Sequence, residues 1–366
     1  MITIFGGALR VSRIRTKAKL AMMLCSLALC ACETPPPAKP APVAAPVVAP
    51  VATDTAKANQ LVQEAALREM VALQDRLYRV AAPLLVNNVA LCPHFARNLL
   101  GFTAKNKYSY SSEFIDSTQR ILGLGDQLQV MGVIAGSGAA KAGLQSGDKL
   151  VSINGVPLPS GPNAETDARA VLVPLLSERT TIDLTVNRNG SELSLKLPLT
   201  HACAFGIELG NTAIVNAYAD GRRVMVTRGM MKMAESDDEL AYVLADQMAH
   251  DVLGHAGKQH TSGAIAEIID NLSRAHPDGS VSVTVKPSAQ EFEVAADKRG
   301  LYMAARAGYA VDNAGKFLTR LAAQYPATAS DSFSAAHPLN ANRLAAIDKV
   351  TTEIKGKQAA KKPVLP

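Results

Sequence analysis

The residues best suited to chemistry lie in the run Asp246-Gln247-Met248-Ala249-His250. Ser236 to Glu239 reads Ser-Asp-Asp-Glu, a capping box that begins a helix running from Leu240 to His255. Residues four apart share one face of a helix, so Asp246 and His250 can both reach one metal ion. Alone, such a pair is more often a packing or exposed pair than a metal site.

Three further elements surround this run in the sequence. They are a predicted hairpin, Ile214–Thr227, with Asp220-Gly221 at its turn, the run Glu293-Val294-Ala295-Ala296-Asp297, and His337-Pro338 followed by Arg343. With them, the chain from about residue 203 to residue 349 resembles the HtpX and CAAX-prenyl-protease type of zinc metallopeptidase, a gluzincin family. Some relatives in that family carry an inserted PDZ domain.

The resemblance implies a role for each candidate residue. It assigns Asp246, His250 and Glu293 to the metal, Gln247 to the position of the general base, His337 and Arg343 to the catalytic groove, and Asp297 and His255 to places beside the site. Arg343 could equally pair with a carboxylate in the core. The implied metal is zinc.

The chain departs from the family where the family has H-E-x-x-H. Asp246 replaces an imidazole ligand by a carboxylate, which makes the implied ligand set harder and a bound water less acidic. Gln247 replaces the glutamate that takes a proton from the zinc-bound water in this class. Because an amide does not titrate near neutral pH, Gln247 cannot be the general base. We therefore expect zinc binding to be weak or absent.

Residues 101–199 predict a separate β-rich module. Residues 139–155 read AAKAGLQSGDKLVSING, which resembles the PDZ signature of bacterial envelope proteases. Its last two residues, Asn154-Gly155, predict a hairpin turn, and Asn189-Gly190 marks a second hairpin. PDZ domains bind an extended peptide as an added strand and commonly hold its C-terminal carboxylate with loop amides. Leu122, Gly123, Leu124 and Gly125 precede the expected binding strand and are the candidate carboxylate loop, although glycine-rich turns before strands are common.

The N-terminal residues predict a secreted lipoprotein. Five basic residues precede the apolar run Leu20–Leu29, which is too short to span a bilayer. The sequence Leu29-Cys30-Ala31-Cys32 resembles a lipobox with Cys32 as the lipidated residue; plain cleavage or a retained anchor is the alternative. Glu33 follows, and in Gram-negative lipoproteins a residue other than Asp favours the outer membrane. Residues 32–56, rich in Pro and Ala, would tether the folded part to that membrane.

Charge and composition argue against a nucleic-acid partner. The formal charge of +6 comes from 38 basic and 32 acidic residues, and removing the five basic residues of the signal leaves 33, or about +1. Aromatic residues make up 4% of the chain and Trp is absent, which excludes an aromatic nucleic-acid platform.

Two of the five cysteines, Cys92 and Cys203, remain once Cys25 and Cys30 leave with the signal and Cys32 takes the lipid. In an oxidising compartment a disulfide persists, so we predict that Cys92 and Cys203 pair across the ends of the β-rich module. Two separate buried thiols are the alternative.

The predicted architecture is α+β. It comprises a signal peptide (1–31), the lipidated cysteine and tether (32–56), an N-terminal helical part (57–100), the PDZ module (101–199), the mainly helical metallopeptidase-like domain with its small hairpin (200–350), and a disordered basic tail (351–366).

The favoured function is a catalytically impaired pseudopeptidase that faces the periplasm. It would hold unfolded or extended envelope polypeptides and bind peptide C-termini through the PDZ domain. An active zinc metalloendopeptidase with an unusual Asp/His/Glu ligand set is one alternative. A PDZ adaptor that recruits a partner protease is the other.

Overall fold

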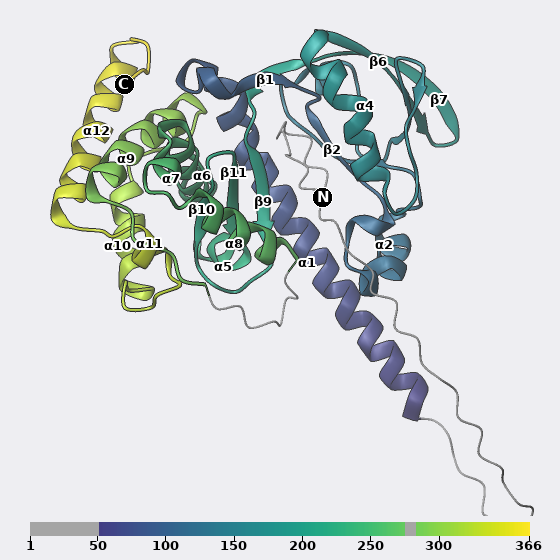
Figure 1. The fold of residues 1–366 in the computed structure, drawn as a ribbon, viewed down its shortest axis with the longest axis horizontal. Coiled ribbons are helices and arrows are strands. Elements are labelled where there is room, and N and C mark those ends of the chain that lie inside the picture. Colours follow the sequence, from purple (N-terminus) through teal and green to yellow (C-terminus); the bar gives the residue numbers. More distant parts are fainter. Residues whose placement is uncertain (1–50, 275–282) are drawn as a thin grey trace, which may run out of the picture. The chain divides into compact units, whose positions relative to one another are not determined.

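A computed structural model describes residues 51–274 and 283–366 (Figure 1). The predicted signal, the lipidation site Cys32 and the tether up to residue 50 lie outside the described residues. Residues from Val62 onward form one compact unit. A second unit ends at Leu61, and the structure describes only its residues 51–61. Among the described helices, none combines the length and apolar character that a bilayer crossing needs.

Helix α1 (Val51–Asn87) begins earlier than the sequence predicted, so the last residues of the expected tether are helical. Leu77, Val80 and Leu84 are fully buried on one face of α1. After the helix ends, Asn88 Nδ2 donates to the carbonyls of Leu84 (2.9 Å) and Met303 (3.0 Å), which ties this end of α1 to helix α9 (Gln290–Arg306). Short 3₁₀ turns follow at Val89–Leu91, Pro93–Phe95, Lys107–Ser109 and Ser112–Phe114.

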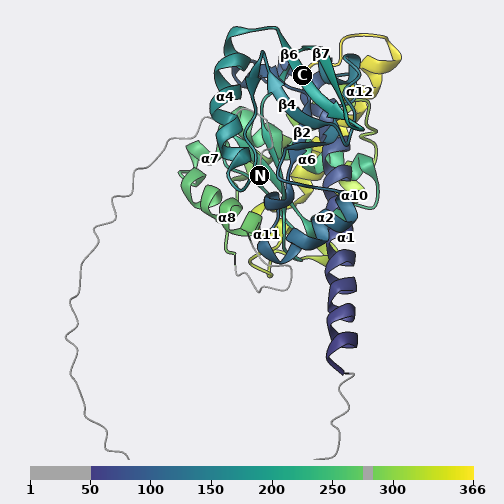
Figure 2. The same ribbon diagram turned by 90° about the vertical axis from the view of Figure 1, so that its right-hand side faces the viewer.

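The β-rich module contains a six-stranded sheet in the order β2-β3-β4-β6-β7, with β5 paired to β4. Its strands are β2 (Phe102–Lys105), β3 (Gln129–Val133), β4 (Lys149–Ile153), β5 (Val156–Pro157), β6 (Thr181–Arg188) and β7 (Ser191–Pro198). Its helices are α2 (Ile115–Leu122), α3 (Gly138–Lys141) and α4 (Ala164–Glu178). Leu172 of α4 shares one buried core with Val130 and Leu184 of the sheet. Figure 2 shows helix α4 in the same part of the fold as strands β4 and β6. Strand β2 lies at the edge of the sheet.

Both predicted turns of this module are confirmed. Asn154 and Gly155 have φ values of 49° and 78°, and Asn189 and Gly190 have values of 53° and 87°. Positive φ at both central residues is what a two-residue type I′ hairpin requires. Ile153 pairs with Val156, and Arg188 with Ser191, so each loop holds two residues.

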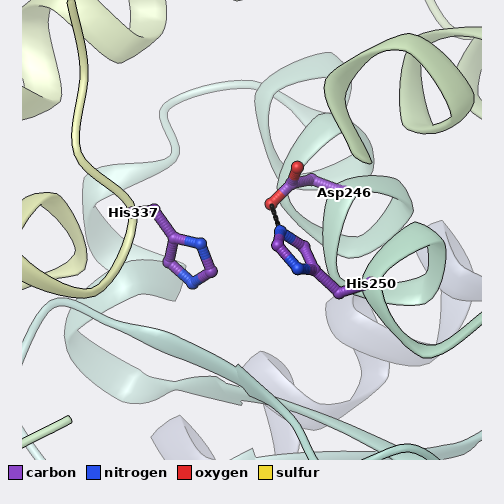
Figure 3. A group of neighbouring side chains, drawn as sticks. All are labelled: Asp246, His250 and His337. Carbon is purple, nitrogen blue, oxygen red and sulfur yellow. Dashed lines mark ion pairs between the residues drawn. The ribbon is translucent and has the colours of Figure 1, made fainter. Parts of the chain in front are cut away.

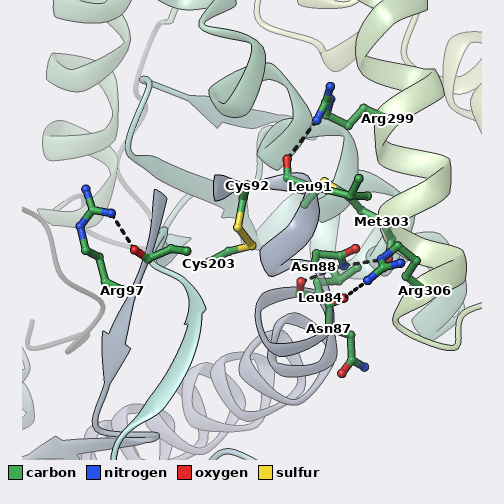
Figure 4. The surroundings of a disulfide bond; sticks show 11 residues. Leu84, Asn87, Asn88, Leu91, Cys92, Arg97, Cys203, Arg299, Met303 and Arg306 are labelled. Atoms are coloured by element: carbon green, nitrogen blue, oxygen red, sulfur yellow. Dashed lines mark hydrogen bonds between the residues drawn. A yellow bond between two sulfur atoms is a disulfide. The ribbon is translucent and has the colours of Figure 1, made fainter. Parts of the chain in front are cut away.

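The module is joined to the rest of the fold by two antiparallel strands, β1 (Ala96–Leu99) and β8 (Thr200–Cys203). Cys92 and Cys203 form the predicted disulfide at the base of this pair (Figure 4). Arg299 Nη1 donates to the Leu91 carbonyl at 3.0 Å and fixes the same corner to α9. Because the bond links residues 111 apart in sequence, it restricts the unfolded chain strongly.

The second sheet has three strands, β9 (Gly206–Gly210), β10 (Ala217–Ala219) and β11 (Arg223–Thr227), in the order β10-β11-β9. Strands β10 and β11 are antiparallel and Gly221 at their turn has a φ of 101°, which confirms the predicted hairpin. Strand β9 pairs parallel to β11 and was not predicted. Strand β10 is an edge strand.

Helices make up most of the remaining domain, as expected for the α+β class. They are α5 (Arg228–Met233), α6 (Asp237–Leu253), α7 (His255–Lys258), α8 (Ser262–Arg274), α9, α10 (Ala314–Gln324), α11 (Phe333–Ala336) and α12 (Ala341–Ala359). Helices α6 and α9 lie side by side (Figure 1). Gly300 makes this possible, because a Cβ there would lie 2.9 Å from the backbone nitrogen of Asp246.

The prediction of a disordered tail from residue 351 is wrong for its first half. Helix α12 continues to Ala359 and fully buries Ile354. Tyr302 on α9 donates to Glu353 Oε1 (2.6 Å), and Lys357 Nζ bonds the same carboxylate at 2.7 Å. Ile354, an apolar residue about one turn past the expected helix end, indicated that the helix continues. The lysines around it obscured this pattern.

Candidate active site

Helix α6 supplies the central residues of the site. Its N-cap, Ser236, accepts a hydrogen bond from Glu239 N at 3.2 Å, and it ends at Gly254, whose φ of 68° stops the helix. Residues Leu240 to Asp251 are all buried. Asp246 and His250 lie on the same face, as predicted, with Asp246 Oδ2 and His250 Nε2 3.9 Å apart (Figure 3).

His337, in the segment between α11 and α12, faces this pair (Figure 3). In the described chain, Asp246, His250 and His337 can each offer one atom to a metal ion. These three atoms all lie within 4.8 Å of one another. Glu293 on α9 was the predicted third ligand. Its Oε1 lies 3.4 Å from His250 Nε2 and 3.1 Å from His337 Nδ1.

An ion-pair network lies behind the site. Arg343 is fully buried; its Nη1 lies 2.6 Å from Glu293 Oε2, and its Nε and Nη2 donate to Asp297 at 2.7 and 2.8 Å. Tyr242 donates to the same aspartate at 2.6 Å. Asp297 therefore lies beside the site as predicted. Arg343 belongs to the core, which was the alternative reading of the sequence, and not to the groove.

Gln247 lies at the position of the general base. Its Nε2 donates to Asp246 Oδ2 at 3.0 Å and lies 3.2 Å from His337 Nε2. An amide N–H donates a hydrogen bond but takes up no proton near neutral pH. This side chain satisfies the polar groups around it without supplying a base.

Burial and neighbouring charges separate the pKa values of these groups. Burial, with Asp297 and Glu293 nearby, raises the pKa of Asp246 to about 7. Burial lowers the pKa of His250 to about 3, which keeps its imidazole neutral. Burial opposes the ionisation of Glu293, but His337 and Arg343 outweigh it and hold the pKa of Glu293 below its usual range. Glu293 is therefore the fixed negative charge of the site.

Asp251, near the C-terminal end of α6, and His255, the first residue of α7, support the site. His255 Nδ1 lies 3.0 Å from His250 Nδ1, and its ring stacks on Phe292 with centroids 4.4 Å apart. Asp251 Oδ1 accepts from Gly221 N at 2.6 Å, which fixes the hairpin turn to the helix. Sequence analysis assigned no role to Asp251. Its contact with Gly221 joins residues 30 positions apart, and no local pattern indicated it.

A small cleft opens at the site. A cavity of about 40 Å³ is lined by Gln247, His250, His255 and His337, by the three residues of β10, and by residues that include Val285 and Ser288. This volume holds a few water molecules at most. Edge strand β10 lies along one wall of the cleft, where an extended chain could pair with it.

The residues present fit a divalent metal ion. Asp246 Oδ1 and His250 Nε2 are buried and have no hydrogen-bond partner within residues 51–274 and 283–366. Such atoms are rare in folded proteins and call for an explanation. Two imidazoles and one carboxylate are also a donor set that zinc accepts.

The predicted carboxylate loop of the β-rich module is in the wrong place. Leu122 to Gly125 follow α2 and precede β3, whose two edges are already paired with β2 and β4. A peptide strand can add only to an edge strand, which in the order of this sheet is β2 or β7. Strand β7 follows a closed two-residue hairpin turn, whereas β2 does not, so β2 is the better candidate. The loop before β2 is Leu100-Gly101, where Gly101 has a φ of 81° and its carbonyl accepts from Ile134 N at 2.8 Å. A glycine directly before an apolar strand was the missed signal.

Comparisons with known proteins support two domains. Residues 185–351 match peptidase family M48, and residues 129–172 match a PDZ domain. No curated protein matches the chain. One similar solved structure is the HtrA3 PDZ domain bound to a phage-derived ligand (FGRWV), with 18% identity, a TM-score of 0.22, and coverage of 28% of this chain and 86% of that chain. Another is a serine endoprotease from Yersinia pestis, with 21% identity, a TM-score of 0.20, and coverage of 29% and 30%.

Proposed function

Since residues 185–351 match peptidase family M48 and residues 129–172 match a PDZ domain, we propose that this protein is a pseudopeptidase of the bacterial envelope. It binds extended polypeptides in the peptidase cleft and peptide C-termini at the PDZ domain, and it does not cleave them.

One observation carries the proposal. At the position of the family's general base, Gln247 donates to Asp246 and lies against His337. A protein that cleaves peptides by this chemistry needs a group there that takes a proton from water, and removal of a general base costs roughly 10²–10⁴-fold in rate. The hydrogen bonds of Gln247 instead hold the ligand side chains in place.

Binding survives the loss of the base because it depends on other groups. Two edge strands, β10 beside the cleft and β2 in the PDZ domain, each offer backbone groups to an extended chain. The disulfide between Cys92 and Cys203 and the β1–β8 pair restrain the connection between the two domains.

A metal ion in the site would be held by Asp246, His250 and His337 and would polarise a peptide carbonyl placed beside it. The chain's own groups then orient the site. Glu293 holds His337 through Nδ1, and Arg343 holds Glu293. No group among these takes over the missing proton transfer, because Asp246, the acid that Gln247 contacts, would itself hold the metal.

The proposed location is the outer membrane, facing the periplasm, with a lipid anchor at Cys32. The lipobox-like sequence supports it, and so does the disulfide, which persists in an oxidising compartment. Labelling of expressing cells with a radioactive fatty acid tests the anchor. The native chain should carry the label and Cys32→Ala should not; equal labelling of the two chains would contradict the proposal.

Peptide capture by the PDZ domain is tested with two peptides of one sequence, one ending in a free carboxylate and one in an amide. We expect amidation to weaken binding by about 10- to 100-fold, because charge-assisted hydrogen bonds to the carboxylate are lost. Fluorescence anisotropy measures the affinity, and mass spectrometry should recover the peptide intact. Equal affinity for the two peptides would refute this mode of binding.

Two glycine variants separate the candidate loops in the same assay. At Gly101 a Cβ would meet Ser137 Cβ at 2.7 Å, whereas nothing lies within 4 Å at Gly123, and both residues have positive φ. Gly101→Ala should weaken peptide binding, and Gly123→Ala should leave it close to native. The reverse pattern would support the loop from Leu122 to Gly125 as the carboxylate-binding loop, as the sequence predicted. Thermal melting of both variants checks that they fold.

A further inference from the structure

We propose that the metal site of this chain has exchanged one ligand, so that Asp246, His250 and His337 bind a divalent ion of the zinc class and Glu293 does not. The inference goes beyond the proposed function, because peptide binding without cleavage needs no metal. Either can therefore fail while the other stands.

His337 is oriented as a ligand. Its Nδ1 lies 3.1 Å from Glu293 Oε1, so an Nδ1–H donates to the carboxylate and the ring's lone pair is on Nε2. That Nε2 faces Gln247, on the α6 side of the site. Metal-binding histidines usually have such a carboxylate or carbonyl on the other ring nitrogen. The ring is also held by stacking on Phe333, with centroids 4.4 Å apart.

Both oxygens of Glu293 have protein partners. Its Oε2 forms an ion pair with Arg343 at 2.6 Å, and its Oε1 lies 3.1 Å from His337 Nδ1 and 3.4 Å from His250 Nε2. All four side chains are buried. Turning Glu293 toward a metal would remove a carboxylate from a fully buried guanidinium, which is costly. Glu293 is therefore best described as the residue that positions His337.

Asp246 and His250 each present a buried ligand atom. Among the described residues, Asp246 Oδ1 and His250 Nε2 have no hydrogen-bond partner, while Asp246 Oδ2 accepts from Gln247. The close approach of Gly300 to the Asp246 backbone fixes the aspartate on α6. Asp246, His250 and His337 can each offer one ligand atom, and these atoms lie within 4.8 Å of one another, which fits a bound cation.

The exchange compensates for the altered motif. The set expected from the family positions, Asp246, His250 and Glu293, has one nitrogen and two carboxylates. The set gathered here has two imidazoles and one carboxylate, the composition of many hydrolytic zinc sites. The substitution of Asp for the family's His is thus balanced by recruitment of His337.

The test is metal binding by the full chain after removal of bound metal. Co²⁺, whose visible spectrum reports its ligands, and Zn²⁺ are added in equilibrium dialysis, and each ion is measured per chain. We expect one ion per chain for the native protein, and visible bands typical of a nitrogen- and oxygen-bound ion. Native protein that binds neither ion would overturn the proposal.

Three variants identify the ligands. His337→Phe keeps an aromatic ring against Phe333 and should lose stoichiometric binding. Glu293→Gln keeps an acceptor for His337 and should still bind one ion, with affinity lower by about 10- to 100-fold, as expected for an outer partner. His260→Ala removes an exposed histidine and should behave as native. If Glu293→Gln abolishes binding while His337→Phe retains it, the family's set holds and the exchange is wrong.

Discussion

Replacing Asp246 by His and Gln247 by Glu together is expected to give this protein peptide hydrolysis that the native chain lacks. The pair restores the imidazole ligand and the base that the family uses, and a positioned general base contributes roughly 10²–10⁴-fold in rate. Release of fragments from a denatured polypeptide, with zinc supplied, measures the gain. A chelator should abolish it.

The two single substitutions are the matched controls. Gln247→Glu alone adds a carboxylate beside Asp246, in a buried site that already contains the carboxylates of Asp246 and Glu293. Asp246→His alone restores a ligand but leaves an amide at the base position. Neither should reach the rate of the double variant. Hydrolysis by Asp246→His alone at the rate of the double variant would show that Gln247 is not what disables the site.

Arg343→Met should destabilise the fold by about 3–5 kcal/mol, because it leaves buried Glu293 and Asp297 without their cation. Arg343 is fully buried and also donates to the carbonyl of His337 at 3.1 Å. The free energy of unfolding in urea, measured on folded protein with its disulfide intact, gives the loss.

The control for this prediction is Arg79→Met. Arg79 pairs with Asp237, but its side chain is 63% exposed. Exposed pairs contribute about 0–1 kcal/mol, so this variant should unfold close to the native protein. Similar losses of unfolding free energy in the two variants would mean that the buried ion pairs of Arg343 stabilise the fold no more than an exposed pair does.

Much of the fold could be predicted from local signals. The Asn-Gly and Asp-Gly turns fix their hairpins because few residues accept positive φ, and the cysteine count after removal of the signal left one pairing. Strand β9 could not be found in this way. Strand β9 pairs in parallel with β11, on the side of β11 that faces away from β10. This pairing is therefore set by tertiary packing and not by a turn.

The candidate site was predicted in its residues but not in their roles. The α6 spacing put Asp246 and His250 on one face, and the structure agrees. The orientation of Glu293, whose Oε1 lies near both His250 and His337, depends on the ion pair of its Oε2 with Arg343. Arg343 lies 50 positions away in sequence, and no local pattern encodes that contact. The PDZ loop was misplaced for a similar reason, since the edge of a sheet is a property of strand order.

The central claim is that the native site holds polypeptides without cleaving them. The most direct test incubates the native full chain with a denatured polypeptide and added zinc, then analyses the mixture by mass spectrometry alongside the double variant. The account predicts a stable complex from which the polypeptide is recovered intact, while the double variant yields fragments. Fragments from the native protein that disappear with chelator would contradict it.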